Sequence, residues 1–315
     1  MTPRNDFEVE VASGLIKMPF SSEVTESVRK LQRGQGSITD HTAIYPEEGL
    51  CAANPENRKQ PRDRDWYLAN VIAPMIERGE IDNKTRTPFD DRKLRYDSSE
   101  FFNAPTYGED DLVVRFGITH FPAFQADINR SNEENLKLQE RGLQDFGDKW
   151  AYFARAPGVA VLPINKGGTI FVGERANEEY GGFLNAVAGH LTYKDKVKQV
   201  DISGEALREL QEEFGIQPGE VSNLRFVGLY SHPIKGDLDF TFLADVAKPE
   251  QYFVSGEWKK SVKEREHKDL VRLATMAEIH ELLETGKVSG ADKTLQVMYS
   301  TRGALMSVYA NEIKN

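Results

Sequence analysis

Residues 205–216 read Glu-Ala-Leu-Arg-Glu-Leu-Gln-Glu-Glu-Phe-Gly-Ile, and this stretch is the most informative part of the chain. At about 100° per residue, an α-helix places Glu209, Glu212 and Glu213 within about 100° of one another. The apolar side chains fall on the other side of the helix: Leu207, Leu210 and Phe214. The sequence therefore predicts a helix with one acidic side and one side that faces a core.

The acidic side of this helix indicates a bound cation. Like charges three or four residues apart destabilise a helix and raise each other's pKa unless a positive charge is near. Glutamates from successive turns can form an oxygen cage for Mg²⁺ or Mn²⁺, which bridge phosphate oxygens and lower the pKa of water. An acidic helix side is more often only a solvated surface. The order of residues at 208–216 favours the metal-site interpretation.

This order resembles the signature R-E-U-x-E-E-x-G-U of the Nudix hydrolase family, in which U is aliphatic. The resemblance is clearest in that box and extends more loosely from about residue 158 to the C-terminus. It implies that Glu209, Glu212 and Glu213 hold a divalent metal ion, Mg²⁺ or Mn²⁺. Arg208 is expected to orient the glutamates through a salt bridge, and Glu209 can also serve as a base through a water molecule.

The upstream half of the box departs from the family pattern. Gly189 is the best match to the glycine that opens the box, and its carbonyl is a further expected metal ligand. The interval from Gly189 to Arg208 is longer than in the family, and Val200 stands where the family has another glutamate. Asp201 or Glu205 is the candidate substitute for that carboxylate.

Three further positions outside the box are candidate site residues. Glu266, with Glu264 as an alternative, is the candidate general base on a downstream loop, although a charged loop is often only solvated. His232 lies between two expected strands, where it either binds substrate or shapes a turn. Arg302 follows two hydroxyl residues at an expected helix start, which suits a phosphate contact or plain N-capping.

Lys194, with Lys196 and Lys198, lies in the inserted stretch before the acidic helix. These lysines either attract an anionic substrate or form a solvated loop.

Near residue 150 a polar, irregular first half gives way to a denser alternation of strand-like and helix-like segments, and we place a domain boundary there. Residues 151–315 are expected to form a Nudix-like α/β/α sandwich with a mixed sheet, and residues 1–150 an additional α+β domain for substrate recognition, a lid or homodimer formation. The expected strands are 112–118, 159–164, 169–172, 224–230 and 240–246. The expected helices are 65–78, one opened by Ser131, one from Asp201 or Ser203 to Gly215, one from Thr275 to Gly286, and 302–312.

Composition excludes several classes of protein. The chain has 315 residues and a net charge of -10, which disfavours a duplex nucleic-acid partner. The single cysteine, Cys51, excludes an intramolecular disulfide and a multi-cysteine zinc site. The N-terminus lacks a signal-peptide pattern and the apolar runs are short, so we expect a cytoplasmic protein with no membrane partner.

Together these features predict a metal-dependent hydrolase of the pyrophosphate bond in a nucleoside diphosphate linked to another moiety, such as a nucleotide sugar or ADP-ribose. One alternative is a nucleotide-binding sensor of the same fold that has lost turnover. Another is an isoprenoid diphosphate isomerase of the same fold, which would use a catalytic cysteine. Cys51 lies outside the Nudix-like region, which argues against the isomerase.

Overall fold

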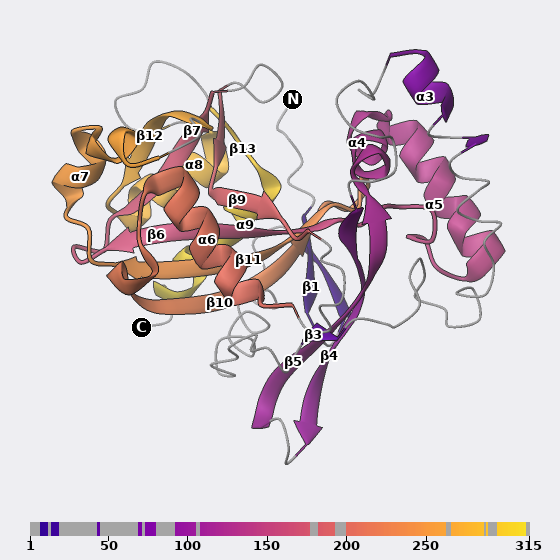
Figure 1. The fold of residues 1–315 in the computed structure, drawn as a ribbon, viewed down its shortest axis with the longest axis horizontal. Helices are drawn as coiled ribbons and strands as arrows, with labels where there is room; N and C mark the ends of the chain where they lie inside the picture. The colour runs from indigo at the N-terminus through magenta and orange to yellow at the C-terminus, as the bar shows by residue number, and fades with distance from the viewer. Residues whose placement is uncertain are drawn as a thin grey trace.

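The computed structural model describes residues 7–11, 14–18, 43–44, 69–70, 73–79, 92–104, 108–176, 182–192, 200–262, 266–286, 288 and 295–312. Over these residues the chain has an α/β fold built on a mixed sheet, which confirms the expected fold class. Helix α6 (Ile202–Phe214) lies in front of this sheet and α9 (Tyr299–Glu312) lies behind it (Figure 1). No helix in the described ranges has both the length and the apolar character needed to span a bilayer.

The main sheet follows the order β13, β8, β7, β6, β11, β10, β1, β2, with β9 paired to β6 and β12 paired to β7. Its strands are β1 (Phe7–Val11), β2 (Gly14–Met18), β6 (Pro157–Asn165), β7 (Ile170–Arg175), β8 (Phe183–Asn185), β9 (Val187–His190), β10 (Val221–Ser231), β11 (Leu238–Val246), β12 (His267–Leu273) and β13 (Gln296–Val297). β6 and β11 are parallel, whereas β10 and β11 are antiparallel. Each strand expected in the second half overlaps an observed one.

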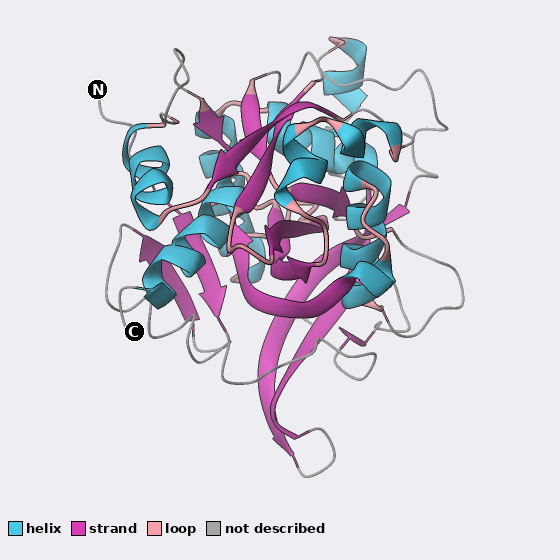
Figure 2. Cartoon of the chain, turned by 90° about the vertical axis from the view of Figure 1, so that its left-hand side faces the viewer, coloured by secondary structure: helices cyan, strands magenta, loops and turns pink. Residues whose placement is uncertain are grey.

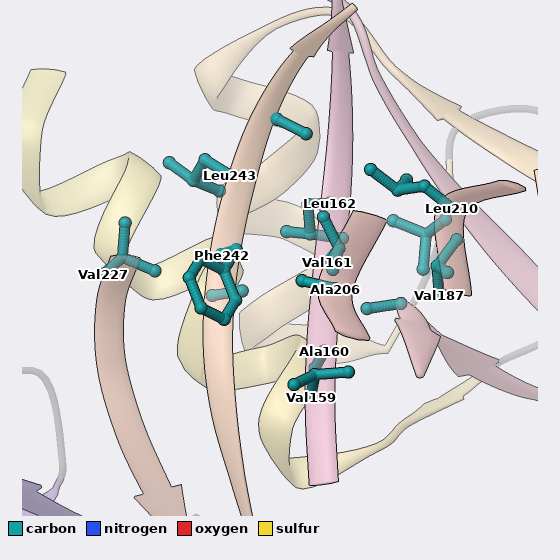
Figure 3. Packing of buried hydrophobic residues seen from close by; sticks show 14 of the residues in the cluster. Val159, Ala160, Val161, Leu162, Val187, Ala206, Leu210, Val227, Phe242 and Leu243 are labelled. Carbon is teal, nitrogen blue, oxygen red and sulfur yellow. The ribbon is translucent and has the colours of Figure 1, made fainter. Parts of the chain in front are cut away.

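Strand β6 is buried on both faces because helices cover both sides of the sheet. Residues 159–162 are fully buried, and Val-Ala-Val-Leu is the continuous apolar run that such a strand requires. Leu210 of α6 and Leu305 of α9 are fully buried as well. Figure 3 shows Val159, Val161 and Leu210 within this core.

Local capping signals set most helix ends as expected. Asp201 accepts a hydrogen bond from the backbone N–H of Gly204 and caps α6, and Gly215 ends α6 at a φ of 66°. Thr275 and Glu278 form the capping box of α8 (Met276–Thr285). The shorter elements between them are η3 (Pro218–Glu220), α7 (Glu250–Val254) and η4 (Glu257–Lys260).

The expectation that the last helix begins at Arg302 is wrong, because α9 begins at Tyr299. The hydroxyl of Thr301 donates to Oδ1 of Asn185 at 3.0 Å and accepts from the N–H of Ala186 at 2.6 Å. This hydroxyl therefore ties the first turn of α9 to the sheet and does not cap a helix that starts after it.

The N-terminal part combines helices with a second sheet. Strands β3 (Ala43–Ile44), β4 (Arg92–Ala104) and β5 (Gly108–His120) form this sheet, and α3 (Ala73–Glu77), α4 (Phe121–Asn129) and α5 (Asn132–Phe146) accompany it. The capping box of Ser131 and Glu134 opens α5 as expected, and the expected strand 112–118 lies within β5. Within the helix expected over 65–78 the structure describes residues 69–70 and 73–78, and α3 lies in the second of these ranges; the other residues of this expected helix lie outside the described ones. The β4–β5 hairpin projects from the body (Figure 2).

The two parts of the chain meet in one core. Leu94, Tyr96 and Phe116 are buried in the same cluster as β6 and α6. The N–H of Leu94 donates to the carbonyl of Leu191 at 3.0 Å, and β1 pairs with β10. Contacts therefore cross the boundary expected near residue 150.

Candidate active site

The guanidinium of Arg208 gathers the carboxylates of α6. Its nitrogens donate to Glu205 (Nε, 2.7 Å), Glu209 (Nη2, 2.5 Å) and Glu212 (Nη1, 2.6 Å). These contacts place one positive charge among three negative ones, in a fork geometry that suits carboxylates. We call Glu205, Glu209, Glu212 and Glu213, together with Glu266, the α6 acidic group.

Glu209 is buried against β9. Its residue is 7% exposed, and a Cβ built on Gly189 would lie 1.8 Å from its Oε1, so only glycine leaves room for the carboxylate in this position. Burial raises the pKa of Glu209 to about 7, although the charge of Arg208 acts in the opposite direction. Glu209 can therefore gain or lose a proton near neutral pH.

Glu213 is buried more deeply and has two protein partners. Its Oε1 accepts a hydrogen bond from the N–H of Ala188 at 3.1 Å, and its Oε2 lies 2.6 Å from Nε2 of His267. Burial raises the pKa of Glu213 well above its usual range. Burial also lowers the pKa of His267 to about 4, so the imidazole is neutral at pH 7 and the contact is a hydrogen bond. The side chain of Glu212, by contrast, is 49% exposed.

Glu266, which immediately precedes β12, joins this group from another part of the chain. Its Oε2 lies 3.0 Å from Nη2 of Arg175, and its backbone carbonyl accepts from the N–H of Ala176. The charge of Glu266 raises the pKa of both Glu209 and Glu213. The role of Glu266 as a general base stays a prediction, and Glu264 lies outside the described residues.

The structure shows the positions of Val200, which stands where the family has a glutamate, and of the two candidate substitutes, Asp201 and Glu205. Val200 is 7% exposed and packs in the main core. Asp201 is used as the cap of α6. Glu205 contacts Arg208, and it is therefore the candidate substitute that lies in the α6 acidic group.

The residues expected to bind substrate lie elsewhere. Nδ1 of His232 accepts hydrogen bonds from the N–H groups of Ile234 and Lys235 at 3.2 Å, which shows its role in the turn. Nη2 of Arg302 donates to the carbonyl of Leu283 in α8 at 2.5 Å. Substrate binding by His232 and Arg302 stays a prediction, and Lys194 lies outside the described residues.

Sequence reasoning missed His267 and Arg175. Both occupy ends of paired strands, and His267 lies opposite Arg175 in the register of β12 and β7. His267 directly follows the candidate base Glu266, and this adjacency was the available signal. Nothing local in the sequence connects either residue to α6.

The donor atoms of the α6 acidic group suit a hard divalent cation, because Mg²⁺ and Mn²⁺ take carboxylate and carbonyl oxygens. Within the described residues no three His, Cys, Asp or Glu side chains are already arranged as a metal cage. Arg208 supplies the positive charge between Glu209 and Glu212. A cation at this place would have to compete with the guanidinium for these carboxylates.

Comparison with known proteins gives similarities of fold over about half the chain. No family model matches, and no curated protein does. A Nudix-family hydrolase from Clostridium perfringens is 13% identical with a TM-score of 0.29, over 51% of this chain and 99% of that one. A MutT protein from Methanosarcina mazei is 17% identical with a TM-score of 0.31, over 51% and 96%. An Ap4A hydrolase from C. elegans is 13% identical with a TM-score of 0.31, over 50% and 98%.

At these TM-scores the similarity carries no weight for function. A proposal for the function of this chain must therefore be based on the residues of the α6 acidic group.

Proposed function

We propose that the chain is a metal-dependent hydrolase that cleaves the pyrophosphate bond of a nucleoside diphosphate linked to another moiety, such as a nucleotide sugar or ADP-ribose. The observation that carries this proposal is the environment of Glu209. This carboxylate is buried, accepts a hydrogen bond from Arg208, and occupies space that only a glycine at position 189 leaves open.

Glu209 is suited to act as the general base. One oxygen of its carboxylate could bind the cation while the other accepts a proton from water. Arg208 holds the carboxylate of Glu209 in place, and Arg175 does the same for Glu266. Either guanidinium could also donate hydrogen bonds to an anionic phosphate, because its planar set of N–H donors matches two phosphate oxygens.

The α6 acidic group would hold the cation through Glu209, Glu212, Glu213 and Glu266, with the carbonyl of Gly189 as a further ligand. Mg²⁺ or Mn²⁺ supplies, when bound, positive charge that offsets the charge of the diphosphate oxygens and lowers the pKa of water. Oε1 of Glu213 accepts a hydrogen bond from Ala188 and Oε2 lies 2.6 Å from Nε2 of His267. With the carboxylate ionised and the imidazole donating from Nε2, each oxygen would retain a second lone pair for the cation.

The experiment is a release assay on the full chain. Phosphate or nucleotide release is measured from nucleotide sugars, ADP-ribose, dinucleotides and nucleoside triphosphates with Mg²⁺ or Mn²⁺, for wild type, Glu212→Gln and Glu284→Gln. Glu284 is an exposed glutamate of α8 and serves as the control. We expect turnover of one substrate class that collapses in Glu212→Gln and persists in Glu284→Gln.

A nucleotide sensor is the second candidate, because Val200 stands in place of a box glutamate and Arg208 already pairs with Glu209 and Glu212. The sensor would be favoured over the hydrolase by two results together. No substrate of the panel would be turned over, and one nucleotide would bind saturably with an affinity that Glu212→Gln does not weaken.

A further inference from the structure

The carboxylate of Glu213 joins three elements that carry site residues. It accepts from the N–H of Ala188, the residue directly before Gly189 in β9. It also contacts His267, the residue directly after Glu266 in β12. Glu213 itself lies one helical turn beyond Glu209 in α6. One side chain therefore links the segments on which Glu209, Gly189 and Glu266 are mounted.

The ring of His267 is held firmly enough to act as a fixed point. The residue is 2% exposed. A Cβ on Gly173 would lie 2.1 Å from its Nδ1, so the ring packs directly on the backbone of β7. The ring of Phe214 meets it edge-on at a centroid distance of 5.4 Å. Packed between these two residues, the imidazole presents Nε2 to Glu213.

We propose that His267 is a positioning residue of the cation site and acts through its hydrogen bond to Glu213. This inference rests on the function proposed above. Hydrogen bonds behind a metal site orient the ligands, and their loss weakens metal affinity by about 10–100-fold. Here the contacts of Glu213 with Ala188 and His267 join α6 to β9 and β12, the elements that carry or adjoin Glu209, Gly189 and Glu266.

The test compares two amide substitutions of different length in the full chain. His267→Gln places an amide nitrogen close to the position of Nε2, whereas His267→Asn is too short to reach Glu213. His280→Gln, at an exposed position of α8, is the control. Binding of Mn²⁺ alone is measured from the electron paramagnetic resonance signal of the free ion, and the unfolding temperature of each variant is recorded.

We expect His267→Asn to weaken Mn²⁺ binding by about 10–100-fold, and His267→Gln to retain most of the wild-type affinity. A purely structural role would lower the unfolding temperature of both variants and leave their Mn²⁺ affinities equal. Equal affinities of the two variants, or wild-type affinity in His267→Asn, would overturn the inference. Absence of saturable Mn²⁺ binding by wild type would instead overturn the proposed metal-dependent function.

Discussion

Two groups of acidic side chains lie on opposite faces of the main sheet, and they differ in what surrounds them. The α6 acidic group lies on the front face, with Arg208 and Arg175 among its carboxylates. The second group, Asp237 and Asp239, lies on the α9 side of the sheet, where the phenol of Tyr299 in α9 donates to Oδ2 of Asp239 at 3.0 Å. We call this second set the α9 acidic group.

Burial raises the pKa values in both groups, to about 7 for Glu209 and to about 6 for Asp237 and Asp239. The α6 acidic group reaches the surface through Arg208, whose side chain is 41% exposed. In the α9 acidic group Asp237 is buried and Asp239 is partly exposed, and both lie near the first turn of α9. A raised carboxylate pKa is therefore common to both groups, and the arginines Arg208 and Arg175 distinguish the α6 acidic group.

Neutralising one carboxylate in each group gives the largest expected contrast. Glu209→Gln should lower kcat for the substrate identified in the release assay by about 10²–10⁴-fold, because a general base is lost. Asp239→Asn should leave kcat close to wild type. Steady-state kinetics of both variants would measure this, and a similar loss in Asp239→Asn would remove the functional distinction between the two groups.

A pair of glycines gives the next contrast, because each makes room for a carboxylate. A Cβ added to Gly189 would lie 1.8 Å from Oε1 of Glu209, and a Cβ added to Gly158 would lie 2.1 Å from Oδ1 of Asp239. Glu209 can swing toward solvent, so Gly189→Ala should mainly weaken Mn²⁺ affinity, by on the order of 10–100-fold. A Cβ on Gly158 would also lie 3.0 Å from the backbone oxygen of Gly189, which cannot turn aside as a side chain can, so Gly158→Ala should mainly lower stability, by about 1–3 kcal/mol.

Mn²⁺ titration and chemical denaturation of both glycine variants separate these effects. Loss of stability without loss of affinity in Gly189→Ala would contradict the proposed role of this position.

The α9 acidic group should make stability depend on pH. Oδ1 of Asp237 is buried without a hydrogen-bond partner, and burial raises the pKa of Asp237 from 3.8 to about 6. Between these values the folded chain keeps a proton that the unfolded chain has lost, so the contribution of Asp237 to stability falls as pH rises. The free energy of unfolding of Asp237→Asn, relative to wild type, should therefore improve by about 2 kcal/mol between pH 4 and pH 8.

Urea denaturation of both proteins at the two pH values would show this. A difference between Asp237→Asn and wild type that is the same at pH 4 and pH 8 would contradict it.

The smallest expected effect is stabilisation by the cation. Mn²⁺ at ten times its Kd should raise the free energy of unfolding of wild type by about 1.4 kcal/mol at pH 8. At pH 6 the same Mn²⁺ concentration should stabilise less, because Glu209 then carries a proton that binding must displace. Thermal unfolding with and without Mn²⁺ measures this, and equal stabilisation of Glu209→Gln would place the ion elsewhere.

The sequence predicted what short-range patterns determine. The acidic and apolar sides of α6 follow from the helical period, and Asp201 and Gly215 mark the ends of that helix by local hydrogen bonding and backbone conformation. The contact of Glu213 with His267 was not predictable, because it joins side chains 54 positions apart through the pairing of β12 with β7. The burial of Glu213 likewise depends on β9 and β12 and not on its own helix.

The hydrogen bond from Leu94 to Leu191 has a practical consequence for studies of this protein. Leu191 lies two residues beyond Gly189, and its carbonyl is satisfied by a strand from the N-terminal part. A fragment that begins at residue 151 would lose this donor, and the removal of Leu94 and Tyr96 would leave cavities in the main core. Biochemistry on a shortened chain would therefore report on a damaged site, and the full 315-residue chain is the right starting material.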